Sequence, residues 1–379
     1  MHNRVLCALT LFGLCAAYGL AFLTQAPNRL VTGVGIPLID LLFDLRWLVL
    51  VPAAVLAAAV FLPSTRQTHW LVCLAAAASL LGWVWLAGAQ AQLAAETAES
   101  PLMRTAFGGG FWVLVVLCAL AITDALQRLA LNAVARALAS LAVVLPVLWL
   151  LTQGHLDALS LLKEYANRQD VFQSAWRRHM QIVLTTLVPT LLIGVPLGVA
   201  AYRRPRLSTP LFAVLNLIQT VPSIALFGLL LAPLAAVAVW WPGSGISGIG
   251  LMPAVLALTL YSLLPIVHST VTGLRQVPGA VVEAATGMGL TPRQIFWRIE
   301  VPLALPLLVA GIRTTTVQAV GLAVVAALIG AGGFGAIMFQ GLLSSALDLV
   351  LLGVLPVVAL AVVVDALFQS LSVFLTPAQ

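Results

Sequence analysis

Long apolar runs recur along the chain and are separated by short polar segments rich in glycine, proline and arginine. The runs are unbroken over about 20 residues, the length that a helix needs to cross a bilayer, and they lack the period-two alternation of barrel strands. This pattern predicts ten transmembrane helices. We place them at 5–24, 47–62, 69–89, 109–125, 134–152, 181–202, 211–232, 249–272, 303–328 and 348–372.

The composition indicates the same class of protein. Of the 379 residues, 62% are hydrophobic and 8% are charged. Soluble domains are about 45–50% apolar and about 25% charged. Because backbone groups in lipid have no water to bond, spanning segments must be helices or closed barrels. We therefore expect an all-α polytopic membrane protein with about ten transmembrane helices.

Basic residues predict the orientation of the chain. The net charge is +6, and most of the arginines lie in short loops, so they indicate membrane topology rather than a nucleic-acid partner. The compact turn YRRPR at 202–206 is the strongest inside signal, and Arg29 and Arg46 fall in outer loops. With ten crossings, both termini are expected in the cytoplasm. The apolar run at 5–23 exceeds the roughly 7–15 residues of a signal-peptide core, which favours an uncleaved span.

A polar stretch at 154–180 divides the chain. Before it, residues 1–153 predict an N-terminal accessory bundle of about five helices. The stretch itself predicts an extracytoplasmic loop whose last part, 171–180, forms an amphipathic helix on the outer surface before the sixth span. After it, residues 181–375 form a second five-span unit, which holds nearly all of the distinctive polar features.

The sequence offers no ATP-binding or catalytic site of its own. A P-loop needs a lysine in GxxxxGK[ST], and the only lysine is Lys163, in LLKEY. The four cysteines and five histidines match no metal-ligand spacing. The GAGGFG stretch at 330–335 fits the letters of a dinucleotide motif but lacks its strand, helix and acidic residue. It predicts a flexible break in a membrane segment, and a gate is the sharper hypothesis for Gly330, Gly332, Gly333 and Gly335.

The loop at 276–302 is polar and predicts two short helices between two apolar spans. Pro278 can open the first, which Gly287 and Gly289 break. Thr291 caps the second, and Gln294 completes a capping box. That second helix is expected to run from Arg293 to about Ile299 and to end at Pro302. Read from the residues alone, the loop is either an amphipathic surface connector or a docking element for a cytoplasmic partner.

This loop resembles the EAA motif of binding-protein-dependent ABC importer permeases, E-A-A-x3-G-x9-I-x-L-P. The match runs from Glu283 to Pro302, with Val301 in place of leucine. In that family the loop forms a coupling helix that sits in a groove of the ATPase subunit. The resemblance therefore implies a coupling loop at 275–302. Its expected ATPase-coupling residues are Glu283, Ala284, Ala285, Gly287, Gly289, Thr291, Arg293, Ile299 and Pro302.

The resemblance extends over about 171–375, the five-span core of a type I importer permease. The segments at 215–230, 260–274 and 310–335 look like the osmoprotectant subfamily, which carries glycine betaine, choline or related quaternary amines. The additional front half makes the larger permease subunit of Yeh-type importers the most similar member. The resemblance implies a bacterial inner-membrane protein that works with two ATPase subunits holding ATP and magnesium. It also implies a second permease chain and an extracytoplasmic solute-binding protein.

Polar side chains inside the core spans are candidates for a translocation pathway, because such groups at membrane depth usually face a cavity or a protein partner. Hydrogen bonding between helices is the alternative for each of them. Arg313 lies too deep in its span to reach the surface easily, and Asp365 is a possible ion-pair partner. The expected pathway set, besides the four glycines above, is Gln219, Thr220, Ser223, Tyr261, Ser262, Arg313 and Gln318.

Two other functions remain open from the residues. An ion-driven secondary transporter would show two repeated halves and a midplane carboxylate. The halves here do not match, and Asp124 and Asp365 lie towards span ends. A membrane scaffold without transport is the third possibility, and the polar groups of the core spans argue against it.

Overall fold

The computed structural model describes residues 3–28, 31, 33–98, 100, 102–243 and 247–375. The chain forms two compact units, Met1–Asn167 (unit 1) and Arg168–Gln379 (unit 2). Each is described by itself. Arg29, predicted in an outer loop, and the last four residues lie outside the described part.

Unit 1 is built mainly of helices, and polar side chains cap the starts of three of them. The Asn3 side chain accepts a hydrogen bond from the backbone N–H of Leu6 at 3.1 Å, and Asn132 does the same for Ala135 at 2.8 Å. Such caps satisfy backbone donors that the first turn leaves unpaired. The helices are α1 (Arg4–Gly19), α2 (Leu50–Ala59), α3 (Arg66–Thr97), α4 (Gly109–Arg128), α5 (Ala133–Thr152) and α6 (Ser160–Asn167).

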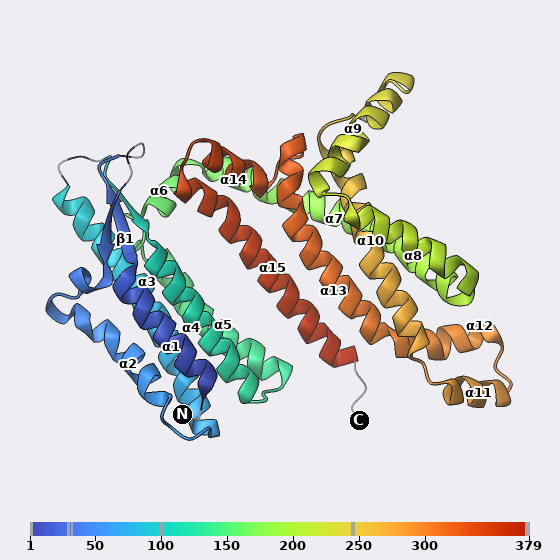
Figure 1. Ribbon diagram of the computed structural model, residues 1–379, viewed down its shortest axis with the longest axis horizontal. Helices are drawn as coiled ribbons and strands as arrows, with labels where there is room; N and C mark the ends of the chain where they lie inside the picture. Colours follow the sequence, from blue (N-terminus) through green and yellow to red (C-terminus); the bar gives the residue numbers. More distant parts are fainter. Residues whose placement is uncertain are drawn as a thin grey trace. The chain divides into compact units, whose positions relative to one another are not determined.

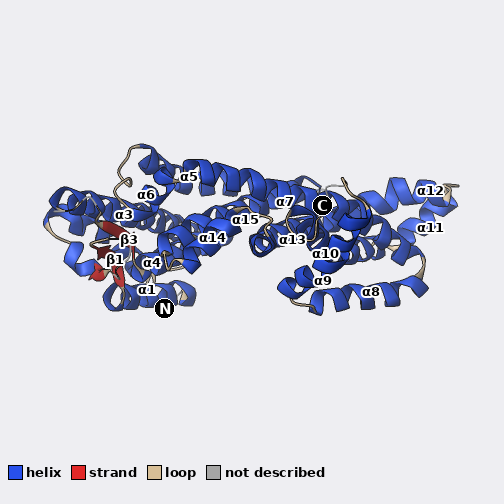
Figure 2. Ribbon diagram, turned by 90° about the horizontal axis from the view of Figure 1, so that it is seen from above, coloured by secondary structure: helices blue, strands red, loops and turns tan. Residues whose placement is uncertain are grey.

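A small antiparallel sheet covers one end of unit 1, and the expectation of a purely helical chain is wrong on this point. Its strand order is β2-β1-β3, with β1 at Ala21–Ala26, β2 at Val34–Pro37 and β3 at Arg104–Phe107. Figure 2 shows the strands together in this unit. The predicted first span, 5–24, therefore ends early, because α1 stops at Gly19 and the chain turns into β1. A short apolar run does not distinguish strand from helix by its periodicity.

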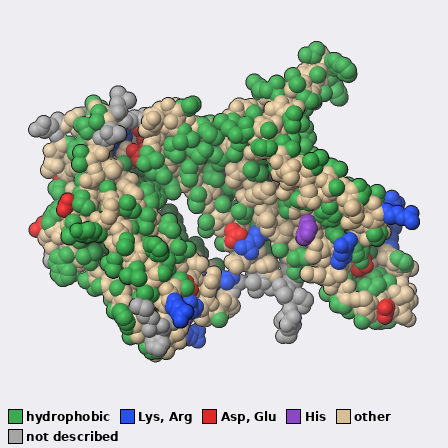
Figure 3. All heavy atoms as spheres, in the orientation of Figure 1, with side chains coloured by type: hydrophobic (Ala, Val, Ile, Leu, Met, Phe, Trp, Pro, Cys, Tyr) green, Lys and Arg blue, Asp and Glu red, His purple; other side chains and the backbone are tan. Residues whose placement is uncertain are grey.

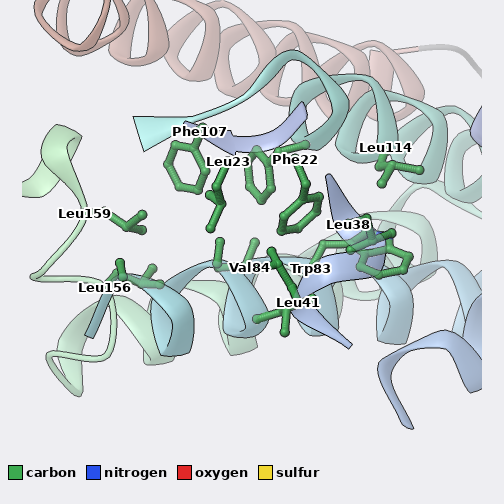
Figure 4. Close-up of a cluster of buried hydrophobic side chains, with 14 of the residues drawn as sticks. Phe22, Leu23, Leu38, Leu41, Trp83, Val84, Phe107, Leu114, Leu156 and Leu159 are labelled. Atoms are coloured by element: carbon green, nitrogen blue, oxygen red, sulfur yellow. The ribbon is translucent and has the colours of Figure 1, made fainter. Parts of the chain in front are cut away.

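The apolar side chains of β1 explain why the strand is stable there. Phe22 and Leu23 are 1% and 0% exposed, and they pack on Trp83 of α3 and on Phe107 and Phe111 (Figure 4). Burying side chains of this size favours folding by roughly 1.5–3 kcal/mol each. After β2, two 3-10 helices, η1 (Leu38–Leu41) and η2 (Asp44–Val49), lead into α2.

The described residues of unit 2 form helices and their connections, without strands. Figure 1 shows α10, α13 and α15 crossing it, with α11 and α12 at one end and α14 at the other. The elements are α7 (Gln169–Arg203), α8 (Pro205–Thr220), α9 (Ser223–Trp240), α10 (Leu251–Arg275), α11 (Gly279–Gly287), α12 (Pro292–Ile295), the π-helix η3 (Phe296–Glu300), α13 (Val301–Val325), η4 (Ala326–Ile329), α14 (Phe334–Leu343) and α15 (Leu347–Leu375).

The helix boundaries of unit 2 correct three predictions. The amphipathic stretch 171–180 is the first part of the unbroken helix α7, because nothing interrupts the backbone before the spanning residues. The predicted span 211–232 is two helices, α8 and α9, separated at Val221 and Pro222. Pro302 does not end a helix. It lies in the first turn of α13, where proline is tolerated, so α12, η3 and α13 follow one another without a gap.

Eight of the described helices are long and apolar enough to cross a membrane. They are α3, α4, α5, α7, α9, α10, the continuous α12–α13 segment and α15. Three apolar helical segments are shorter: Arg4–Gly19, Arg46–Ala59 and Phe334–Leu343. The prediction of a multi-pass helical membrane protein is confirmed, whereas the count of ten is not.

Helices α7, α10 and α13 pack closely because small residues lie at their crossings. A Cβ added at Gly194 or Gly198 of α7 would come within 2.9 Å of Ile266 or 2.5 Å of Thr270 on α10. The two contacts advance together along both helices, so α7 and α10 run parallel. Small residues of this kind let membrane helices approach closely.

Candidate functional site: the coupling loop and a polar hollow

The first helix of the loop, α11, starts and stops where the sequence predicts. Pro278 is its N-cap, and the chain reverses at Gly289, where φ is +82°. The Leu290 N–H donates to the Ala285 carbonyl at 3.2 Å, and the Gly289 N–H donates to that of Thr286 at 2.9 Å. This bond pair is a Schellman cap, which requires the left-handed conformation that glycine adopts without strain.

The second helix begins with the predicted capping box. Gln294 N–H donates to Thr291 Oγ1 at 3.4 Å, and Thr291 N–H donates to Gln294 Oε1 at 2.8 Å. Pro292 occupies the first turn, where its missing N–H is not needed. The cap fixes the direction in which the chain leaves Gly289, and therefore the angle between α11 and α12.

The turn between α11 and α12 is called the α11–α12 corner below. Replacing Thr291 by alanine should loosen this corner without unfolding the protein. The change removes one reciprocal bond of the box, and N-cap losses of this type cost about 1 kcal/mol. We expect faster amide hydrogen exchange at residues 292–296, while exchange in α10 stays unchanged. Thr291→Ser, which keeps the hydroxyl, is the matched control. Equal exchange in both variants would contradict the role of the cap.

Most of the predicted coupling residues are exposed on the surface of the loop. The exposed members are Glu283, Ala284, Gly287, Gly289, Thr291, Arg293 and, in the first turn of α13, Pro302. Ile299 is half-buried in η3. Ala285 is 0% exposed and packs inside the chain, so of the alanine pair only Ala284 is free for another surface.

Two exposed apolar residues of the same loop were missed by sequence reasoning. Met288 is 72% exposed and Trp297 is 61% exposed. Charged side chains gather at the same end of unit 2 (Figure 3). The exposed surface of the loop therefore includes both charged and large apolar side chains, a mixture suited to contact with another protein.

A groove separates the loop from the end of α7. Its walls include Val199 and Tyr202 on one side and Val282, Arg293 and Trp297 on the other. Contacts bridge it at one place. Tyr202 donates its hydroxyl hydrogen to Glu300 Oε1 at 3.0 Å, and the Arg203 guanidinium lies 4.4 Å from the centre of the Phe296 ring.

A polar hollow between α8, α10 and α13 brings together two predicted pathway residues, Gln219 and Gln318. Its volume is about 1090 Å³ including the open mouth. Its described lining contains no Asp, Glu, Lys or Arg. Sequence reasoning missed the other polar members of the wall: Asn216, His268, Ser269, Thr272 and Thr314. Asn216 precedes Gln219 by three positions, a helical spacing that could have revealed a shared face.

The other predicted pathway residues lie outside this hollow. The Tyr261 hydroxyl donates to the Val221 carbonyl, and Gln219 Nε2 donates to the Tyr261 carbonyl at 2.9 Å, so the two residues fasten α10 to the break between α8 and α9. Thr220 bonds its own helix at the Leu217 carbonyl. Ser262 is fully buried and Ser223 is half-buried.

Arg313 and Asp365 form the predicted ion pair. Arg313 Nε and Nη2 donate to the two carboxylate oxygens of Asp365 at 2.6 and 2.7 Å, joining α13 to α15. This two-point geometry is the strongest arrangement for an arginine and a carboxylate. The side chains remain 34% and 43% exposed in the chain by itself. The pairing is thus confirmed, and a gating role stays a prediction.

The GAGGFG stretch forms the predicted break: residues 330–333 lie between η4 and α14, and Phe334 and Gly335 begin α14. Gly330, Gly332 and Gly333 all have positive φ, between 78° and 83°. The loop is held by α7: Arg178 Nε donates to the Ala331 carbonyl at 2.7 Å, and a Cβ on Gly333 would lie 3.2 Å from the His179 ring. Gly335 packs against η4 and α13 with no room for a side chain. Sequence reasoning missed Arg178 and His179.

Both units of the chain are similar to families of known proteins. Residues 190–373 match the family "Binding-protein-dependent transport system inner membrane component", and residues 3–162 match "ABC transporter permease YehY, N-terminal domain". The chain is 40% identical over 200 residues to the osmoprotectant import permease protein OsmW of Salmonella typhimurium, covering 53% of this chain and 89% of that one. The chain belongs to the binding-protein-dependent ABC permease family.

Other relatives of this permease carry similar names. It is 36% identical over 200 residues to the choline transport system permease protein OpuBB of Bacillus subtilis, covering 53% of this chain and 86% of the relative. A solved structure of the MetNI methionine ABC transporter, in an inward-facing conformation, is 25% identical, with a TM-score of 0.46, and covers 52% of this chain and 93% of its own. The family membership confirms a permease subunit of an ABC importer, and the secondary-transporter alternative finds no support.

Proposed function

We propose that this permease forms the pathway of an ATP-driven importer for a compatible solute such as glycine betaine or choline. The observation that carries the proposal is the exposed α11–α12 corner, which has the EAA spacing and is fixed by the Gly289 turn and the Thr291 box. Relatives named for osmoprotectant and choline transport support the substrate class. The chain has no P-loop lysine, so the energy must enter through a contact surface.

The proposal includes a set of partners. Two ATPase subunits, which bind ATP and magnesium, dock on the coupling loop at 275–302. A second permease chain, a copy or a homologue, completes the pathway, and an extracytoplasmic binding protein delivers the solute. This arrangement places the loop and both termini in the cytoplasm, with the protein in the bacterial inner membrane. Residues 1–153 act as an accessory bundle, 154–180 lie on the outer side, and 181–375 form the core.

The polar hollow fits passage of such a solute. Amide and hydroxyl groups of Gln219, Thr314 and Gln318 can take the place of water around a zwitterion or a cation in transit. A carboxylate in the same place would bind a quaternary ammonium strongly and slow its release, because charge pairs strengthen at low dielectric. The four loop glycines and the Arg313–Asp365 pair are proposed gate elements of the same pathway.

Transport in reconstituted vesicles tests the proposal. The complex of permease and ATPase, with the binding protein added outside, should accumulate labelled glycine betaine or choline only when ATP is enclosed. An ATPase subunit without catalytic activity serves as the control, and an ionophore removes ion gradients. Uptake that continues without the ATPase and follows an ion gradient would overturn the importer assignment.

A further inference from the structure

At its inner end, helix α7 is tied to the segment where α12 becomes α13 by a hydrogen bond, a cation–ring contact and a small apolar cluster. Tyr202 bonds Glu300, which lies in the π-helix at the root of α13, and Arg203 lies over the Phe296 ring. Tyr202, Phe296 and Val301 also share a small apolar cluster with Leu274 and Ala304. These contacts join the last turn of α7 to the point where α12 becomes α13.

A hollow lies on each side of these contacts between the end of α7 and η3, so they are the main connection between the two elements there. One hollow is the groove between α7 and the loop, and the other lies between residues 195–203 of α7 and residues of α10, η3 and α13. Both hollows include Arg203, Phe296 and Trp297 in their walls. A displacement of α12 therefore reaches α7 at this level through the Tyr202–Glu300 bond, the Arg203–Phe296 contact and the apolar cluster around Tyr202.

The other end of α7 holds the GAGGFG stretch at 330–335, here called the glycine loop. Arg178 Nε donates to the carbonyl of Ala331, the second residue of GAGGFG. The Phe334 ring, which starts α14, is 0% exposed and lies against the rings of Phe172, Trp176 and His179 of α7. The position of the glycine loop thus depends on where the first turns of α7 lie.

The two attachments are one membrane thickness apart on a single helix. From Arg178 to Tyr202 the helix rises about 36 Å at 1.5 Å per residue, close to the hydrocarbon thickness of a bilayer. Pro189 and Pro196 lie between them and weaken the backbone ladder locally. The tight parallel contacts of Gly194 and Gly198 with α10 support the helix there, so it can move as one body with α10.

We infer that α7 is the mechanical link between the coupling loop and the glycine loop, with Tyr202 and Arg178 as the positioning residues at its two ends. The inference rests on the proposed function. When the ATPase displaces the α11–α12 corner, the Tyr202–Glu300 bond moves α7, and the Arg178–Ala331 bond carries that shift to GAGGFG. Neither residue needs to touch the solute or the nucleotide.

Replacing Tyr202 by phenylalanine tests the inner attachment. The ring and its packing stay, and only the hydroxyl donor is lost. In the vesicle assay we expect the ATPase to stay bound and ATP to be hydrolysed, while solute transported per ATP falls about fivefold, the size expected for one lost hydrogen bond. Tyr18→Phe, at a tyrosine 87% exposed in α1, is the matched control and should keep the parental ratio.

Acceptor variants separate a specific bond from general packing. Glu300→Gln keeps a side-chain oxygen acceptor and should keep the ratio, whereas Glu300→Met should lose it as Tyr202→Phe does. Adding Tyr202→Phe to Glu300→Met should cause little further loss, because one bond is removed by either change. A purely structural role would instead lower the amount of folded complex and leave the ratio of the remaining complex unchanged.

The Arg178–Ala331 hydrogen bond at the other end of α7 is tested in the same assay. Arg178→Met should lower the same ratio, and combining it with Tyr202→Phe should be no worse than either alone if one linkage carries the motion. Additive losses, or a parental ratio in both single variants, would overturn the inference. If the unaltered complex shows no ATP-dependent uptake, the proposed function itself fails, and this outcome is distinct from uptake that Tyr202→Phe leaves unchanged.

Discussion

Gly289→Asp should abolish ATP-driven uptake while leaving the protein inserted in the membrane. The backbone at Gly289 has φ +82°, and a Cβ added there would meet nothing within 4 Å, so the substitution causes strain without a clash. A non-glycine residue forced into such a conformation costs roughly 1–3 kcal/mol. The turn would relax, the angle between α11 and α12 would change, and a new negative charge would face the ATPase. Copurification of the ATPase and vesicle uptake measure the loss.

Gly279→Asp is the matched control for Gly289→Asp. It adds the same charge at the opposite end of α11, where space is open and φ is not positive. A carboxylate is favourable in the first turn of a helix. Gly289→Asn separates strain from charge, because asparagine tolerates the left-handed conformation better than most residues. Uptake by Gly289→Asp equal to that of Gly279→Asp would refute the coupling role of the turn.

Arg313→Met should destabilise unit 2 strongly. Helix α15 runs from Leu347 to Leu375, so Asp365 lies ten residues inside its end and not at the end of a span. The change leaves its carboxylate without the arginine, and an unpaired charge costs up to roughly 2.5–3.5 kcal/mol at the centre of a spanning helix. We expect a lower unfolding temperature of the purified protein and less correctly folded protein in the membrane. The exchange Arg313→Asp with Asp365→Arg should recover most of the loss, since it restores an ion pair between α13 and α15.

The Arg128–Asp124 pair provides the comparison for Arg313. It joins neighbouring turns at the end of α4, with Nε and Oδ2 2.8 Å apart, and its side chains are 36% and 22% exposed. Pairs of this type contribute about 0.5 kcal/mol. Arg128→Met should therefore shift the unfolding temperature little. Equal shifts for Arg128→Met and Arg313→Met would show that depth in the membrane does not set the cost.

The loop was predictable from sequence because its signals are local. Proline at 278, glycine at 289 and the Thr291–Gln294 box each act within a few residues, and all three occur where expected. The Arg313–Asp365 pair was predictable for another reason: a charge deep in an apolar span needs a partner, and few acidic residues were available. The hollow was only partly predictable, since Gln219 and Gln318 meet there while Tyr261 and Ser262 do not line it.

The sequence alone determined that this is a helical membrane protein with a capped, polar loop carrying the EAA spacing, because composition, run length and capping are properties of neighbouring residues. Only the tertiary structure decided which apolar runs form one helix, which break, and which become strands. Phe22 and Leu23 form a strand because Trp83 and Phe107 bury them, and α7 matters because its two ends meet Glu300 and Ala331. Contacts between residues far apart in the chain set these outcomes, and no local pattern records them.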